Sequence, residues 1–356
     1  MQLWHVQCGS DREGVANGMN KINKADYEFT FLKNVFKPEF SNLLILAVMF
    51  TITAVLQKNF FETKSIVRNI NAFTPLILLT MGSAIVIISG GLDLSAGSAL
   101  SLFTCVLTTV MKKDDPITGI YAILIAFGVA ILVGVINGIG IGYLRIPPVI
   151  VTFATSYMWL GTALFLRPTP GGETVDWFRT FYNIGTVNGI PDFIKKIGNV
   201  IPPALILVLV GCFLWFIISK TKTGRYIYAV GSNNDSAYAS GINTAKVQMM
   251  ACIINSIFIF LAALFFVGQN QSGDARMGDP LTLRAIASAV VGGIALTGGR
   301  GNVYFALVGA LILSFVNKII FFANIPNAYQ TLVSGFIVII AIAGPVAYTL
   351  YNKERL

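Results

Sequence analysis

The chain of 356 residues is 55% hydrophobic and only 12% charged, whereas about a quarter of the residues of an average soluble domain are charged. Its net charge of +9 would suit a nucleic-acid partner, but Lys and Arg lie mainly between apolar segments, as in proteins anchored in a bilayer. The composition therefore excludes an ordinary soluble domain. It predicts an all-α polytopic membrane protein without a nucleic-acid partner.

The cysteines give no sign of a structural framework. Cys8, Cys105, Cys212 and Cys252 are scattered and show no paired spacing, so we predict neither a disulfide framework nor a metal site. We expect no cofactor in this chain.

The first 40 residues are polar and charged, and the first apolar run begins only near Leu43. This pattern differs from a secretory signal, which places its apolar segment close to the N-terminus. We expect residues 1–40 to form a cytoplasmic tail, disordered in part, and residues 41–350 to form the transmembrane domain.

Ten apolar runs are each about long enough for a helix that crosses the hydrocarbon core, which needs about 20 residues. They cover residues 41–57, 72–89, 95–111, 117–142, 147–166, 201–218, 247–268, 283–297, 303–322 and 329–350. With ten spans, both termini lie on the same side. Lys220, Lys222 and Arg225 follow directly on the sixth run, and the positive-inside rule therefore places the 219–246 loop and both termini in the cytoplasm. The long polar connection 168–200 then lies outside.

A strip of small residues follows one face of the fourth run. Alanine or glycine recurs every four residues, at Ala126, Ala130, Gly134, Gly138 and Gly142. Small side chains let two helix backbones approach closely in lipid. We expect a tight helix crossing on this face.

The 219–246 loop contains the signals of a short helix. Asn233, Asn234 and Asp235 can cap a first helical turn, because a side-chain oxygen accepts its free amides, and Gly241 suits the left-handed stop position. We predict a helix of about a turn and a half over 236–240. By composition alone it would be an ordinary helix on the membrane surface.

A second feature interrupts the apolar sequence between the second and third runs. Gly90 and Gly91 break it, and Asp93 and Ser95 follow. A carboxylate inside a membrane suggests function, but Asp93 or Ser95 can also cap the next helix near the cytoplasmic interface. We favour the cap and leave the functional role open.

Other polar groups lie in or between the later runs. Gly298, Gly299 and Arg300 form a glycine-rich turn, but the phosphate-binding loop requires a Gly-Lys pair, and the chain contains none. Asn137 and Asn255 lie inside spans, where they can bond across helices or contact a substrate. Lys318 lies toward one end of the ninth run, and we expect its ammonium to reach the interface.

Three of these stretches resemble the permease subunits of bacterial ABC importers for monosaccharides, of the ribose, galactoside and autoinducer-2 type. Residues 90–98 match the pattern Gly-Gly-Ile/Leu-Asp-Leu-Ser-x-Gly-Ser, and residues 292–301 match its later glycine-rich motif. Residues 224–242 match most of a cytoplasmic Gly-Arg…Ser-Gly-Ile segment, with Tyr238 where a small residue is common. The resemblance covers roughly residues 65–350.

The resemblance implies a subunit of a larger machine in the bacterial inner membrane. A second permease subunit, identical or different, would complete the path, cytoplasmic ATPase subunits would hydrolyse ATP, and an external binding protein would deliver the sugar. The 224–242 segment would be the coupling helix that contacts the ATPase. Its residues for this role are Gly224, Arg225, Gly231, Asn233, Asp235, Ala237, Tyr238, Ser240 and Gly241.

A second set of residues are candidates for a structural role or for lining the translocation path: Gly90, Gly91, Asp93, Ser95, Asn137, Asn255, Gly298, Gly299 and Arg300. Thr152 and Thr155 are further candidates for lining the path. Nucleoside-importing relatives have similar permeases, so a nucleoside is the alternative substrate. An ion-coupled secondary transporter would need titratable groups within the spans, and the candidates weighed for that role are Asp93 and Lys318.

Overall fold

The computed structural model describes residues 38–182 and 202–324, together with positions 326, 329, 332, 335, 336 and 339. Within this part the chain is helical, and its only strand-like pairings are two isolated bridges. The helices are α2 (Pro38–Leu56), α3 (Thr63–Ile88), α4 (Ala96–Val110), α5 (Ile117–Gly138), the π-helix η1 (Ile139–Tyr143), α6 (Pro148–Leu166), α7 (Asp176–Tyr182), α9 (Pro203–Lys220), α10 (Lys222–Ser232), α11 (Asn234–Ala239), α12 (Thr244–Asn270), α13 (Leu281–Val291) and α14 (Val303–Phe322).

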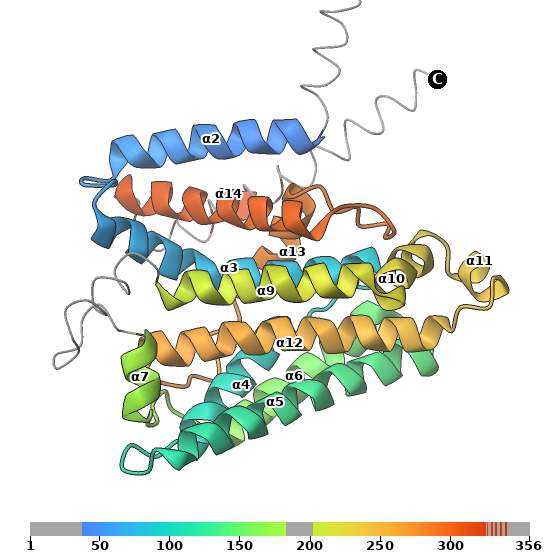
Figure 1. Ribbon diagram of the computed structural model, residues 1–356, viewed down its shortest axis with the longest axis horizontal. Coiled ribbons are helices and arrows are strands. Elements are labelled where there is room, and N and C mark those ends of the chain that lie inside the picture. The colour runs from blue at the N-terminus through green and yellow to red at the C-terminus, as the bar shows by residue number, and fades with distance from the viewer. Residues whose placement is uncertain are drawn as a thin grey trace, which may run out of the picture.

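The long helices lie side by side in a bundle, with α10 and α11 at one end and α7 at the other (Figure 1). We call these the α11 end and the α7 end. Six described helices are long and apolar enough to cross a membrane: α3, α5 with η1, α6, α9, α12 and α14. This confirms a polytopic helical membrane protein, while the count of ten spans and the orientation of the termini stay predictions.

Nine of the ten predicted spans coincide with a helix, and the tenth, 329–350, lies outside the continuously described residues. The N-terminal tail before Pro38 and residues 183–201 of the predicted external connection also lie outside them. Three lengths were wrong. α3 begins at Thr63, nine residues before the predicted start at residue 72. α2 begins at Pro38, inside the predicted tail, and α13 ends at Val291, six residues before the predicted end. It ends there because Gly293 turns the chain with a φ of +90°.

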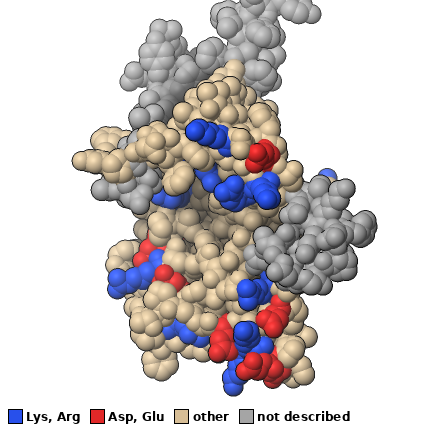
Figure 2. Space-filling view, turned by 90° about the vertical axis from the view of Figure 1, so that its left-hand side faces the viewer, with Lys and Arg blue, Asp and Glu red and all other residues tan. Residues whose placement is uncertain are grey.

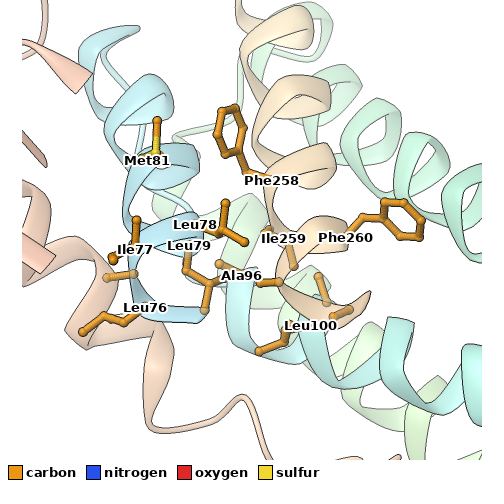
Figure 3. Close-up of a cluster of buried hydrophobic side chains, with 14 of the residues drawn as sticks. Leu76, Ile77, Leu78, Leu79, Met81, Ala96, Leu100, Phe258, Ile259 and Phe260 are labelled. Carbon is orange, nitrogen blue, oxygen red and sulfur yellow. The ribbon is translucent and has the colours of Figure 1, made fainter. Parts of the chain in front are cut away.

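The core forms around α3, whose most apolar stretch is 83% buried. It is packed against α9, α12, α13 and α14. In Figure 3, Leu78 and Leu79 of α3 lie beside Ala96 of α4 and Ile259 of α12, and all four side chains have no exposed surface. Most residues of this stretch are apolar, as expected of a helix that is enclosed on nearly every side.

The predicted strip of small residues packs α5 and η1 against α12. A methyl group added at Gly134 would lie 2.5 Å from the Cα of Ile253, and one added at Gly138 would lie 2.6 Å from the Cα of Met249. Gly142 makes a similar approach to Ala245. The tight crossing is confirmed, and it fixes α12 as a neighbour of α5 along its length.

Candidate functional site

The three motifs that carried the resemblance meet at the α11 end of the bundle. The amide of Gly299, in the turn before α14, donates a 2.8 Å hydrogen bond to the carbonyl oxygen of Ile88, the last residue of α3. Gly231, near the end of α10, packs against both groups, and Gly90 lies beside Gly231. We call these backbones of Gly90, Gly231, Gly298 and Gly299 the glycine junction.

The junction leaves no room for side chains. A methyl group added at Gly231 would overlap the carbonyl oxygen of Ile88 and lie 2.7 Å from the Gly299 amide nitrogen, and one added at Gly298 would lie 2.7 Å from the carbonyl oxygen of Gly231. Backbones at this separation require glycine. The junction thus joins the end of α3, the end of α10 and the turn between α13 and α14 without intervening side chains.

The 219–246 loop contains two helices, of which the sequence predicted one. α11 has Asn233 as its N-cap, and the Oδ1 of Asn233 accepts a 2.8 Å hydrogen bond from the Ser236 amide. Gly241 follows with a φ of +81°, so the predicted stop is confirmed. α10 was missed, although Thr221 caps it in the same way by accepting from the amide of Gly224.

Most of α11 is open to solvent. Tyr238 is 67% exposed and Asp235 and Ser240 are exposed, whereas Ala237 is buried and fixes the helix to the bundle. The Oγ of Ser240 donates to the carbonyl oxygen of Ser236 within the same turn. Arg225 is exposed on α10, where its guanidinium donates weakly to the carbonyl oxygen of Lys220 at 3.4 Å.

A cavity of about 540 Å³ separates α11 from the turn between η1 and α6. Asp235, Tyr238 and Gln248 line one side, and Arg145 and Gly90 line the other. Arg145 has a φ of +55°, a left-handed conformation that is uncommon for residues with a Cβ. Arg300, predicted with the same group, is exposed at the α13–α14 turn and does not line this cavity.

Asp93 lies in the non-helical segment between α3 and α4 and is 5% exposed. Its Oδ1 accepts hydrogen bonds from the amide of Ser95 at 2.8 Å and from the Oγ of Ser95 at 2.6 Å. Its Oδ2 accepts from the Nδ2 of Asn255, in α12, at 2.6 Å. Asp93 therefore shapes the turn before α4 and also joins that turn to a distant helix.

The predicted capping position at the interface was wrong. Asn255 is the twelfth residue of α12, about 17 Å along the helix axis at 1.5 Å per residue, so Asp93 lies deep in the bundle. The segment after Gly91 returns toward the interior, and Ser95 stands at the N-cap of α4 without a side-chain cap bond of its own.

Asn137 continues this buried polar network toward α6. Its Nδ2 donates to the Oγ of Ser95 at 2.9 Å, and its Oδ1 accepts from the Oγ1 of Thr155 at 2.7 Å. Thr152 accepts from the amide of Leu94 and donates to the carbonyl oxygen of Leu92. Asn137 and Asn255 thus both form hydrogen bonds across helices, which is one of the two roles open for them.

Sequence reasoning missed two polar partners in the same region. The Oγ1 of Thr282, in α13, accepts a 2.9 Å hydrogen bond from the amide of Gly97, and the Oγ of Ser101 accepts one from the amide of Gly278. Nothing local marks these residues, since their partners are 185 and 177 residues away. Among the described residues, no cluster of three or more His, Cys, Asp or Glu side chains could hold a metal ion.

The chain is similar in sequence to several known permease proteins. The chain is 28% identical over 306 residues to the ribose import permease of Haemophilus influenzae, covering 85% of this chain and 91% of that one. It is 30% identical to the ribose import permease of Bacillus subtilis, covering 85% and 90%. It is also 27% identical to the autoinducer 2 import system permease of Photorhabdus laumondii, covering 85% and 87%. No solved structure matches.

The family comparison covers the part of the chain that holds all three motifs. The profile described as "Branched-chain amino acid transport system / permease component" matches residues 65–342. This range begins in the first turn of α3 and contains the glycine junction, the Asp93 network and α11. The chain therefore belongs to this family of transport-system permease components.

Proposed function

We propose that this chain is the membrane-spanning permease subunit of a binding-protein-dependent ABC importer and that α11 is its coupling helix. The observation that carries the proposal is the glycine junction, because it joins the exposed helix pair to the ends of membrane-spanning helices. The motor would be a separate cytoplasmic ATPase. The chain would act without a cofactor of its own.

Backbone contact gives a physical route for coupling. α11 is a short capped helix that continues from α10 through Asn233, and α10 contacts Ile88 of α3 and Gly299 through Gly231. A force on α11 would therefore reach α3 and the α13–α14 turn without passing through flexible side chains. Packed helices shift between discrete arrangements, so a small displacement here can open one side of the path.

The proposed substrate is a monosaccharide. The relatives that the chain resembles are named for ribose and autoinducer 2. The assembly would lie in the bacterial inner membrane and comprise a second permease subunit, identical or different, an external substrate-binding protein and the surrounding lipid. We propose no role in binding nucleic acid.

Deletion of residues 234–240 tests the coupling role. We expect the deleted chain to insert into the membrane normally and to lose co-purification with its ATPase. Tyr238→Ala should weaken the same association, because this side chain is 67% exposed in the last turn of α11. Tyr157→Ala is the matched control, since Tyr157 is 62% exposed on α6. Normal ATPase association in the deletion would disprove the assignment.

The substrate class is tested on the external binding protein that the proposed importer would use. We expect equilibrium dialysis against sugars and nucleosides to show retention of a monosaccharide. Retention of a nucleoside would change the cargo to the alternative and leave the machinery as proposed.

An ion-coupled secondary transporter is the competing class. Both carboxylate oxygens of Asp93 already accept hydrogen bonds from Ser95 and Asn255, which supports a structural role for this buried carboxylate. Uptake in a strain without any partner ATPase, abolished by an uncoupler, would favour the ion-coupled class. The ABC proposal predicts no uptake in that strain.

A further inference from the structure

Residues 271–280 connect α12 to α13 as a non-helical segment that lies along α4. Gly273 exchanges two backbone hydrogen bonds with Gly171, at 3.0 and 2.8 Å, and contacts Cys105 and Thr108 near the end of α4. Farther on, the amide of Gly278 donates to the Oγ of Ser101 and its backbone contacts Gly97 near the start of α4. The segment therefore runs from the α7 end into the bundle.

Two short helices begin where this segment ends. α4 has 15 residues and α13 has 11, or about 23 Å and about 17 Å at 1.5 Å per residue, less than the roughly 30 Å of a hydrocarbon core. The amide of Gly97 and the Oγ1 of Thr282 form a hydrogen bond between their first turns. Both helices are thus shorter than a full span and start from a common point inside the bundle.

The face of the segment that points away from α4 carries charge. Gly273, Ala275 and Gly278 are buried, whereas Arg276 and Asp279 are exposed. Non-helical backbone at membrane depth occurs only where protein covers it or water reaches it, and charged side chains there face a water-filled space. Water on this side of the segment would solvate both charged side chains.

A cavity of about 330 Å³ lies at the start of α13, between α3, α13 and α14. Phe73, Leu76 and Leu281 form its apolar wall, and Ser314, Arg284 and Lys318 form its polar wall. Arg284 and Lys318 are half-buried, and neither has an acidic partner among the described residues. Figure 2 looks onto the α7 end of the molecule. Lys and Arg gather in the upper half of this view and mix with Asp and Glu in the lower half.

We propose that this cavity is the sugar-contacting part of the translocation path, with Arg284 and Lys318 as the residues that hold the sugar. The assignment rests on the proposed function. Arginine and lysine side chains only donate hydrogen bonds, so they fit a ligand rich in hydroxyl and ring oxygens. Phe73 and Leu76 offer an apolar surface to the C–H faces of such a ring. The volume lies at the small end of the range for ligand pockets, about 300–1,000 Å³.

Thiol accessibility tests whether water fills the cavity. In the full chain with Cys8, Cys105, Cys212 and Cys252 changed to Ala, Arg284→Cys and Lys318→Cys should react with a charged, impermeant methanethiosulfonate reagent at least about tenfold faster than Phe213→Cys, because water carries the reagent. Phe213 is 64% exposed on α9 and serves as the lipid-facing control. Equal, slow labelling at all three positions would overturn the proposal.

A lipid headgroup is the competing occupant of a cationic cavity in a membrane. Reconstitution into phosphatidylcholine vesicles and into vesicles containing phosphatidylglycerol separates the two. We expect the same labelling rates at positions 284 and 318 in both. Protection by phosphatidylglycerol alone would identify an anionic lipid site instead and overturn the sugar assignment.

Uptake by the assembled transporter tests the contact with sugar. Arg284→Gln and Lys318→Gln should each raise the KM for the imported sugar at least about fivefold while ATPase co-purification stays unchanged. Lys64→Gln, an exposed change on α3 away from the cavity, should leave KM unaltered. Unchanged KM in both cavity variants would overturn the assignment. If the unmodified transporter took up no sugar, that result would count against the proposed function. The labelling rates would still decide whether the cavity is open to water.

Discussion

Individual glycines decide how closely α10 lies to the end of α3 and to the turn before α14. Gly231→Ala would place a methyl group on the carbonyl oxygen of Ile88 and near the Gly299 amide. We expect the free energy of unfolding to fall by about 1–3 kcal/mol, the usual cost of inserting a group into a packed interior. ATPase co-purification should weaken as well. Thermal unfolding of the purified chain in detergent measures the first effect.

Gly128→Ala is the matched control for that substitution. Gly128 lies in α5, and a methyl group added there meets nothing within 4 Å. Alanine favours a helix over glycine by up to about 1 kcal/mol, so this change should leave stability equal or slightly higher. Equal losses at Gly231 and Gly128 would show that the junction is looser than its contacts indicate.

For the helices, the sequence predicted where each one lies in the chain better than it predicted how long each one is. A run of apolar residues marks each span because lipid requires about 20 of them, and nine runs fell on helices. The run at 283–297 continues through Gly292 and Gly293, however, and hydropathy does not register the left-handed turn that ends α13 there.

The hydrogen-bond partners inside the site could not be predicted from the sequence, for a different reason. Asp93 was singled out correctly as an unusual carboxylate, but its bond to Asn255 spans 162 residues. Its cap of the local turn follows from sequence spacing, whereas the depth of that turn depends on how α4 docks against α12. A single sequence contains the spacing that predicts the local turn, but it does not contain the helix docking that sets the depth of the turn.

The hydrogen bond between the first turns of the short helices α4 and α13 leads to a further prediction. Thr282→Val keeps the shape of the side chain but removes the oxygen that accepts from the amide of Gly97. A buried backbone amide left without a partner costs about 1–3 kcal/mol, and we expect the melting temperature to fall accordingly. Thr162→Val should have little effect, because Thr162 is exposed and bonds only to Met158 of its own helix. Indistinguishable melting of the two variants would argue against this contact.

Considered as a whole, the molecule places α11 and α7 at opposite ends of the bundle (Figure 1). α11 extends from one end, while α7 and the Lys112–Asp115 turn lie at the other (Figure 1). The helices between them are long and apolar enough to cross a membrane. The proposed importer needs this separation, because its ATPase would act on one side of the membrane and the sugar would arrive on the other.

The direction in which the bundle crosses the membrane leads to a prediction that a labelling experiment tests. In the background without native cysteines, Lys113→Cys should react with an impermeant maleimide in intact cells, and Tyr238→Cys should react only in inside-out vesicles. Both side chains are exposed, so burial cannot explain a difference between them. The basic residues Lys220, Lys222 and Arg225 beside α11 favour this orientation through the positive-inside rule. The reverse pattern would place α11 outside the cell, where no cytoplasmic ATPase could reach it, and labelling of both from one side would contradict the transmembrane arrangement of the bundle.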